Sequence, residues 1–249
     1  MAPIRLDIIL PCFNPPQDWA TELPQTIRNL EKALGTEVET RLILVNDGSA
    51  RGISTQNIEW LHAQLPRFVY VSYAPNQGKG NALRQGVLES TGDFQIYTDI
   101  DFPYTEASFL AIFEELISGR ADIAAGVRNE EYYAHVPPAR KFISKVLRWL
   151  LRTFLRIKIT DTQCGLKGFN AKGRKVFLTT TINRFLFDLE FIFLASGRKD
   201  LAISPIQVEL KPGVVFSKAR LGILLRESLN FTSILARGIR QRFFPRREA

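Results

Sequence analysis

Short apolar runs alternate with segments of helical spacing through the first half of the chain. The runs are rich in β-branched and aromatic residues, and they have the length of strands buried in a sheet. In the segments between them, apolar residues return every three or four positions, which is the period of an amphipathic helix. This alternation predicts an α/β fold with a mostly parallel central sheet flanked by helices. The predicted strands are residues 6–10, 41–45, 68–72, 94–98 and 122–127, and the predicted helices are residues 23–34, 53–65, 80–89 and 106–117.

The regular alternation stops after residue 127, and two basic amphipathic segments follow, at residues 141–158 and 221–244. In the first of them the basic side chains lie three or four positions apart on one stripe, and apolar side chains fill the remaining surface. A basic face beside a wide apolar face is typical of a helix at a membrane interface, although packing of the apolar face against a protein core is the competing interpretation. The basic stripe consists of Lys141, Lys145, Arg148, Arg152 and Arg156.

The chain has 249 residues, of which 45% are hydrophobic and 23% are charged, as in ordinary globular proteins. No proline-rich, glycine-rich or low-complexity linker divides it. We therefore expect one α/β domain over residues 1–219, which includes the helix at residues 139–158. A C-terminal basic amphipathic helix and tail are expected over residues 220–249.

Charge is divided unevenly along the chain. Residues 1–139 contain 10 lysines and arginines against 18 acidic residues, whereas residues 140–249 contain 23 against 7. A basic half of this kind is typical of a protein that meets a polyanion or an anionic membrane surface. No uncharged stretch reaches the roughly 18 residues that a transmembrane helix requires, and the two cysteines are too few for a disulfide framework. We expect a cytoplasmic protein that associates peripherally with a membrane.

Polar or glycine-rich loops follow four of the predicted strands. In open sheets of parallel strands, ligands bind outside the carboxyl ends of the strands, so these loops are candidates for one binding site. Asp99 and Asp101 come directly after an apolar strand, and two carboxylates so placed can hold a hard divalent cation that keeps positions open for phosphate oxygens. The four loops are residues 11–14, 46–49, 76–80 and 99–101.

Two of these loops offer contacts for a nucleotide. The carboxylate of Asp47 can accept hydrogen bonds from the ring N–H groups of a nucleobase. Gly78, Lys79 and Gly80 open a predicted helix, so their backbone N–H groups and the lysine ammonium could face a phosphate. Each loop by itself is also compatible with an ordinary turn. Four such loops on one edge favour a binding site.

Together these motifs resemble the inverting family 2 glycosyltransferases, which have a GT-A fold. Residues 140–145 and 161–169 narrow the resemblance to the polyprenyl-phosphate glycosyltransferases, the dolichyl-phosphate glucose and mannose synthase group, and residues 161–169 look closer to the glucosyl branch. The resemblance extends over about residues 4–218. It implies metal-dependent, inverting transfer of a hexose from a nucleotide-sugar, with UDP-glucose favoured, to a polyprenyl or dolichyl phosphate. The motifs that carry it are Pro11-Cys12-Phe13-Asn14, Asn46-Asp47-Gly48-Ser49, residues 76–82 and Asp99-Ile100-Asp101.

The resemblance also implies roles for single residues. Asp99 and Asp101 would hold Mg²⁺ or Mn²⁺ on the diphosphate, and Lys218 belongs to a segment that closes over the donor. The implied catalytic residues are Asp101, Asp161, Arg128 and Arg140. The expected donor-binding residues are Pro11, Asn14, Asp47, Gly78, Lys79, Asp99 and Lys218, and the expected acceptor-binding residues are Arg128, Arg140, Ser144 and Gln163.

Two positions depart from the family pattern. Pro15 stands where an acidic residue usually follows the first Asn, and Pro103 stands where a Gln usually follows the second Asp. Proline offers neither a carboxylate nor an amide, so one donor contact and one metal ligand are missing from the expected set. Water can fill the metal position, because Mg²⁺ commonly keeps several water ligands.

A phosphate acceptor requires no general base, because its second pKa of about 6 leaves it largely dianionic at neutral pH. Alignment and charge stabilisation would then suffice for catalysis. Two other interpretations stay open: a family 2 transferase acting on a saccharide or another hydroxyl, with Asp161 as general base, and a non-catalytic module that binds nucleic acid or anionic lipid through residues 140–249. Nucleic acid is disfavoured, because no motif interleaves aromatic and basic residues and the first half is acidic. The oligomeric state is not determined by the sequence.

Neutralising Arg148, Arg152 and Arg156 together is expected to weaken binding to anionic liposomes, because each basic side chain near such a surface contributes about 1 kcal/mol. Nucleotide binding should be unchanged, since the strand-end loops are untouched. Liposome sedimentation and nucleotide titration measure the two properties. Unchanged partition of the variant into liposomes would refute the membrane role of this segment.

Overall fold

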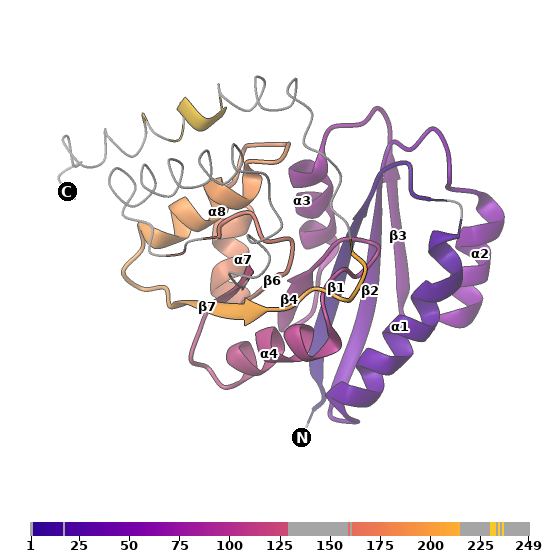
Figure 1. Ribbon diagram of the computed structural model, residues 1–249, viewed down its shortest axis with the longest axis horizontal. Helices are drawn as coiled ribbons and strands as arrows, with labels where there is room; N and C mark the ends of the chain where they lie inside the picture. Colours follow the sequence, from indigo (N-terminus) through magenta and orange to yellow (C-terminus); the bar gives the residue numbers. More distant parts are fainter. Residues whose placement is uncertain are drawn as a thin grey trace.

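The computed structural model describes residues 2–16, 18–128, 159, 161–214, 230–232, 234 and 236, and the following concerns these residues. One sheet contains β1 (Ile4–Cys12), β2 (Val38–Asp47), β3 (Phe68–Tyr73), β4 (Phe94–Tyr97), β5 (Ile123–Arg128), β6 (Lys167–Asn170) and β7 (Ile203–Val208). The strand order is β3-β2-β1-β4-β6-β5-β7 (Figure 1). β6 runs antiparallel between β4 and β5, and the other neighbouring pairs are parallel. The predicted fold class, a mostly parallel sheet flanked by helices, is confirmed.

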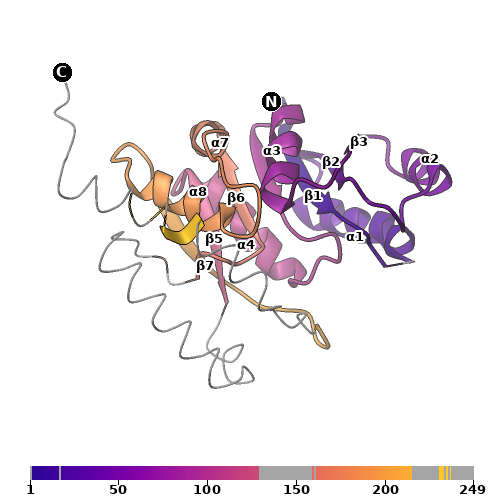
Figure 2. The same cartoon turned by 90° about the horizontal axis from the view of Figure 1, so that it is seen from above.

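Helices cover both faces of the sheet. α1 (Trp19–Leu34), α2 (Thr55–Gln64) and α4 (Glu106–Ile117) pack on one face, and α3 (Lys79–Glu89), α7 (Ala171–Phe177) and α8 (Phe187–Ser196) pack on the other. Figure 2, seen from above, shows α3, α7 and α8 on the opposite side of the strands from α1 and α4. In β1, Ile8 and Leu10 belong to the core under α1, whereas Ile9 belongs to the core under α3. Because both faces are covered, the central strands are apolar at successive positions, as in Ile8-Ile9-Leu10 of β1 and Leu42-Ile43-Leu44-Val45 of β2.

The predicted alternation is confirmed as far as β5. All five predicted strands and all four predicted helices of that part are present, with shifted ends. The regular alternation stops after residue 127 as predicted, since β6 is antiparallel and α7 and α8 follow each other directly. The sequence analysis did not predict β6, α7, α8 or β7.

These later elements lack the periodicity that reveals an element in a sequence. β6 has four residues and begins with Lys167 and Gly168, so it shows no alternation of apolar and polar positions. In α8 nearly every residue is buried, because the helix is enclosed on all sides. A helix that is apolar all round has no amphipathic period.

The two predicted basic helices lie largely outside the described residues. All of residues 141–158 lie outside them, and of residues 221–244 only 230–232, 234 and 236 are described, all of them helical. Ile234 is 1% exposed in the core beneath α3 and α8, and Phe231 packs against the same core. At these two positions the segment packs on the domain. The boundary at residue 219 is not tested by these contacts and stays a prediction. Within the described residues, no helix combines the length and the apolar character needed to cross a membrane.

Asp7 joins three strands at the amino end of the sheet. Its carboxylate is 2% exposed and accepts hydrogen bonds from Arg41 Nε at 2.9 Å and Arg41 Nη2 at 3.0 Å. The backbone N–H groups of Thr91 and Gly92 also donate to it, each at 2.8 Å. Arg41 lies on β2, and Thr91 and Gly92 precede β4. One buried charge therefore ties β1 to both of its neighbours.

Asp7→Ala is expected to lower the free energy of unfolding by about 3 kcal/mol. The substitution leaves a partly buried guanidinium and two backbone N–H groups without their acceptor. Urea unfolding followed by circular dichroism measures the change. A loss below about 1 kcal/mol would show that water replaces the carboxylate at this position.

Candidate active site

Asn14 binds the loop after β1 to the loop after β2. Its Oδ1 accepts hydrogen bonds from the backbone N–H groups of Ala50 and Arg51, and its own backbone N–H donates to Ser49 Oγ at 2.9 Å. Asn14 has a φ of 48°, a left-handed conformation that asparagine tolerates better than most residues. Asn14 therefore shapes the rim of the predicted donor site, and its direct contact with a donor stays a prediction.

The prolines of this rim are packed against the protein. Pro11, near the end of β1, is half-buried, and Pro15 is buried. A Cβ added at Gly52 would lie 2.5 Å from the carbonyl oxygen of Pro15, so the two backbones are in close contact. Between the prolines, Phe13 is 52% exposed. The position that usually carries an acidic residue thus faces the interior, and the side chain that this loop exposes is an aromatic ring.

Asp47 fixes the loop that leads into α3. Its side chain is 3% exposed and accepts hydrogen bonds from Asn76 Nδ2 at 2.6 Å and from the backbone N–H groups of Gln77 and Gly78, each at 2.8 Å. Both carboxylate oxygens are therefore engaged within the protein. Asp47 shapes this loop, and its direct contact with a nucleobase stays a prediction.

The N-terminus of α3 does not present its glycine N–H groups to a ligand. The N–H of Gly78 donates to Asp47, and the N–H of Gly80 donates to the carbonyl of Asn183 at 2.8 Å. Gly78 has a φ of 110°, and an added Cβ there would lie 2.5 Å from that same carbonyl oxygen. The prediction that these N–H groups face a phosphate is wrong, because the loop before α8 packs on this helix end.

Lys79 and Asp99 form an ion pair between α3 and the end of β4, in which Lys79 Nζ donates to Asp99 Oδ1. Burial opposes the charge of the lysine, but the carboxylates of Asp99 and, more weakly, Asp188 outweigh it and raise the pKa of Lys79. Partial shielding from water, followed by the negative charge of Asp99, raises the pKa of Asp101. The structure thus brings Lys79, Asp99 and Asp101 together, as the strand-end prediction requires.

The two carboxylates of Asp99 and Asp101 fit a hard divalent cation. Their mutual repulsion is relieved by a positive charge, and carboxylate oxygens are ligands that Mg²⁺ and Mn²⁺ accept. Over the described ranges no cluster of three or more His, Cys, Asp or Glu side chains is present. Two protein ligands suffice where phosphate oxygens and water complete the coordination.

Arg128 and Asp161 form a second, more deeply buried ion pair at the end of β5. Arg128 Nε and Nη2 donate to the two carboxylate oxygens at 2.6 and 2.8 Å, and the backbone N–H of Arg128 donates to Asp161 at 3.2 Å. The side chains are 13% and 4% exposed. Burial of the Asp161 carboxyl opposes its ionisation, but the hydrogen bonds and the charge of Arg128 outweigh this and lower the pKa of Asp161. Asp161 is therefore ionised at neutral pH.

The turn at residues 161–166 lies between these two ion pairs. It carries Asp161 at one end, and near the other end Gly165 lies so close to Asp99 that an added Cβ would be 2.8 Å from Asp99 Oδ2. The backbone N–H of Gly165 donates to Tyr104 Oη at 3.0 Å. Gln163 Nε2, in the same turn, is buried and has no hydrogen-bond partner within the part of the chain that is described. An unpaired buried donor is costly, so this amide is suited to bind a ligand.

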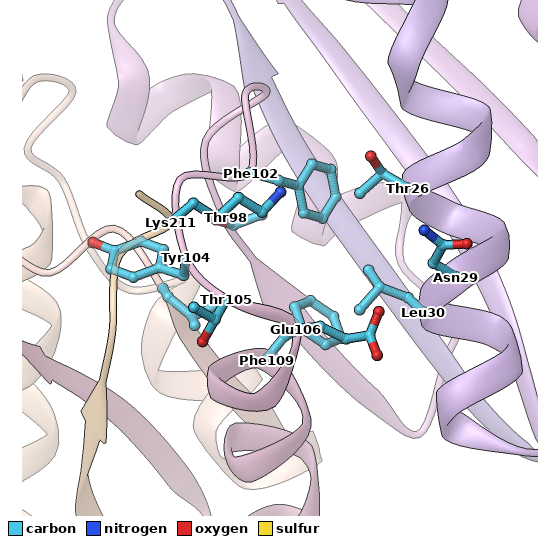
Figure 3. Close-up of a pocket in the computed structure, with 11 residues that line it drawn as sticks. Thr26, Asn29, Leu30, Thr98, Phe102, Tyr104, Thr105, Glu106, Phe109 and Lys211 are labelled. Carbon is cyan, nitrogen blue, oxygen red and sulfur yellow. The ribbon is translucent and has the colours of Figure 1, made fainter. Parts of the chain in front are cut away.

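A cavity of about 150 Å³ lies behind the loop that carries Asp99 and Asp101, between α1 and the start of α4 (Figure 3). Phe102 and Lys211 line it, and the carbonyl of buried Pro103 accepts the backbone N–H of Lys211 at 2.8 Å. Phe102 has a φ of 43°, which is unusual for a bulky residue, and such strain is concentrated at functional sites. Its lining combines residues of α1 and α4 with Thr98 and Leu166, which adjoin Asp99 and Gly165 along the chain.

Three predicted site residues, Arg140, Ser144 and Lys218, lie outside the described residues, and their roles stay predictions. The sequence analysis missed Lys167 and Asp188, which are buried behind the turn at residues 161–166. A signal for Asp188 was present, because it is an acidic residue at the start of an apolar helix. Acidic side chains are rarely fully buried unless they are paired.

Comparison with known proteins places this geometry among glycosyltransferases. The dolichyl-phosphate beta-glucosyltransferase of Drosophila melanogaster is 30% identical to this chain over 222 residues, which are 82% of the chain and 66% of that relative. The enzyme of the same name from Saccharomyces cerevisiae is 27% identical over 224 residues, again 82% of the chain and 66% of the relative. The chain thus spans slightly less than two thirds of the length of these relatives.

Two solved structures share the fold. Glucosyl-3-phosphoglycerate synthase from Mycobacterium tuberculosis, in complex with uridine diphosphate, is 15% identical and has a TM-score of 0.67 over 95% of this chain and 80% of that one. Mannosyl-3-phosphoglycerate synthase from Rubrobacter xylanophilus is 14% identical, with a TM-score of 0.67 over 96% and 75%. This likeness confirms the predicted GT-A fold. A model of the family named Glycosyl transferase family 2 matches residues 7–177, which include Asp47, both acids of the 99–101 motif and the Arg128–Asp161 pair, and the chain belongs to this family.

Proposed function

We propose that this chain transfers a hexose from a nucleotide-sugar, with UDP-glucose favoured, to a polyprenyl phosphate at a membrane surface. The two curated relatives are dolichyl-phosphate beta-glucosyltransferases. The mycobacterial enzyme of the same fold has been solved with UDP-glucose and Mn²⁺. These relatives support the classes of donor and acceptor, and the chemistry of the site supports the type of reaction.

The observation that carries the proposal is the pairing of Asp161 with Arg128. A hydroxyl acceptor requires a general base. Asp161 is poorly suited to this task, because both of its oxygens accept hydrogen bonds from Arg128 and its pKa is lowered. A phosphate monoester needs no base, since it is already ionised above its second pKa of about 6. The arrangement therefore favours a phosphate acceptor.

Arg128 is the described residue best placed to receive that phosphate. Asp161 holds its guanidinium at the end of β5, and a guanidinium fixed in place keeps a positive charge at a defined position, which attracts a phosphate. The unpaired Gln163 amide on the same turn adds a neutral donor. In this proposal Arg140 and Ser144 complete the acceptor site.

On the donor side, Asp99 and Asp101 would hold Mg²⁺ or Mn²⁺ together with the diphosphate. When bound, the cation neutralises the charge that develops on the departing nucleoside diphosphate. Lys79 adds a second positive charge beside these carboxylates. Direct displacement by the acceptor phosphate inverts the anomeric carbon, so an α-linked donor gives a β-linked product. The residues of the chain thus contribute alignment and fixed charge, and no proton transfer is required of them.

The test is transfer by the full chain in detergent, with a panel of UDP-glucose, UDP-GlcNAc and GDP-mannose and with dolichyl or undecaprenyl phosphate. We expect a β-linked glucolipid from UDP-glucose that requires Mg²⁺ or Mn²⁺. Asp101→Ala should lower transfer by about 100-fold or more, the effect typical of removing a charge-stabilising group. Mass spectrometry of the lipid extract measures the product.

Asp200→Ala is the matched control, because it removes an acid from an exposed ion pair with Arg198, on the turn between α8 and β7. It should transfer at the rate of the wild type. Glucose transfer to 3-phosphoglycerate or to a saccharide hydroxyl, with no glycolipid, would overturn the phosphate acceptor. A glycolipid formed equally by Asp101→Ala would overturn the role of the 99–101 motif.

Gly165→Ala is expected to weaken binding of UDP in the presence of Mn²⁺ by about 10-fold, with little change in thermal stability. The added Cβ would lie 2.8 Å from Asp99 Oδ2, so the carboxylate must turn away, and a movable side-chain end makes this inexpensive for the fold. Calorimetric titration and thermal melts measure the two effects. Gly197→Ala is the control, since its nearest neighbour lies 3.5 Å away. Equal UDP affinity of the two variants would show that UDP binding does not depend on the present position of the Asp99 carboxylate.

A further inference from the structure

Lys167 and Asp188 form a fully buried ion pair beneath the site. Lys167 Nζ lies 2.7 Å from Asp188 Oδ1, and the two side chains are 0% and 5% exposed. Lys167 begins β6, and Asp188 lies in the first turn of α8. A carboxylate in the first turn of a helix is favoured by the helix dipole, which helps to explain why the chain accommodates an acid there.

Two further hydrogen bonds extend this pair to neighbouring segments. Tyr97 Oη, at the end of β4, donates to Asp188 Oδ1, and Lys167 Nζ donates to the carbonyl oxygen of Cys164. Tyr97 and Lys167 are directly opposite each other in the β4–β6 register. The four groups therefore tie β4, β6, α8 and the turn at residues 161–166 to one point.

Stability alone gives little reason for charges at this place. The pair adjoins a cluster of aromatic rings through Tyr97, and replacing a buried ion pair by apolar side chains of similar size is often neutral or stabilising. The stability of the core therefore does not explain why two charges are desolvated here. The rings of this cluster, which contact one another, are Tyr97, Phe169, Phe177, Phe187 and Phe191.

The positions of the four groups indicate what that property is. Tyr97 lies two residues before Asp99 on the same chain segment. Cys164 precedes Gly165, where an added Cβ would lie 2.8 Å from the Asp99 carboxylate. Cys164 also follows Asp161, which pairs with Arg128, by three residues. The buried pair therefore contacts the short segments that carry the donor-side and the acceptor-side groups.

We propose that Lys167 and Asp188 are positioning residues, which hold the turn at residues 161–166 at a fixed distance from the 99–101 motif and so set the spacing between donor and acceptor. They touch neither substrate and act through Cys164, Gly165 and Tyr97. The assignment of the two sides as donor and acceptor rests on the proposed function.

The test replaces the network by apolar side chains, in the triple variant Tyr97→Phe, Lys167→Met, Asp188→Leu. A single substitution would leave an unpaired buried charge and could unfold the protein, whereas the triple variant removes both charges. We expect a melting temperature within about 5 °C of the wild type and UDP affinity with Mn²⁺ within about threefold. Transfer to the polyprenyl phosphate should fall at least about 10-fold, with hydrolysis of the donor by water retained.

The double variant Asp7→Asn, Arg41→Met is the matched control. It removes another buried ion pair, at the opposite end of the sheet, so it should lower the melting temperature and leave the ratio of transfer to hydrolysis unchanged. Transfer by the triple variant within threefold of the wild type would overturn the proposal. So would a loss of transfer, hydrolysis and UDP binding together, since that would mark a purely structural role.

Crystal structures of the wild type and the triple variant separate this proposal from the proposed function. The triple variant should show the turn at residues 161–166 displaced and the contact between Arg128 and Asp161 altered, whatever the acceptor is. An unchanged turn would overturn the positioning role, even if transfer is reduced. A displaced turn in a protein whose wild type makes no glycolipid would instead overturn the acceptor assignment and leave the positioning role in place.

Discussion

The direction of β6 determines where the site can form. This strand runs antiparallel between β4 and β5, and its first residue, Lys167, lies opposite Tyr97 on one side and Ala125 on the other. Because β6 runs against both neighbours, it begins at the edge where they end, and the turn before it lies beside Asp99. A parallel strand in the same place would begin at the opposite edge. The closeness of Gly165 to Asp99 is therefore a consequence of strand direction.

Three ion pairs line this edge from the rim inward. Lys79 with Asp99 is partly exposed, Arg128 with Asp161 is largely buried, and the pair of Lys167 with Asp188 is completely enclosed. The exposed pair can exchange partners at low cost, because water screens charges near the surface. The enclosed pair cannot, because separating buried charges costs several kcal/mol. The ion pair on the donor side can therefore rearrange, whereas the pair beneath it stays fixed, because burial increases from the first to the second.

The sequence predicted the edge of the site better than its interior. The strand-end loops could be assigned because the rule depends only on topology. The contact between Lys79 and Asp99 does not follow from that rule, because β2 and β1 lie between β3 and β4 in the sheet. The partner of Gly80 could not be found in this way, since its N–H donates to Asn183, about a hundred positions away. Spacing within a motif carries no information on such a contact. The same limit hid Asp188, whose partner Lys167 lies in a strand of four residues.

The two ends of the sheet use buried charge differently. At the amino end, Asp7 accepts four hydrogen bonds from Arg41, Thr91 and Gly92, so its charge is balanced within the protein. At the carboxyl end, partial burial and, after it, the negative charge of neighbouring Asp99 raise the pKa of Asp101. Because the repulsion between the two carboxylates disfavours the charged state of the free site, a bound cation gains from relieving it. At the amino end, the buried charge is thus neutralised within the protein. At the carboxyl end, the negative charge of Asp99 and Asp101 can be neutralised further by a bound cation.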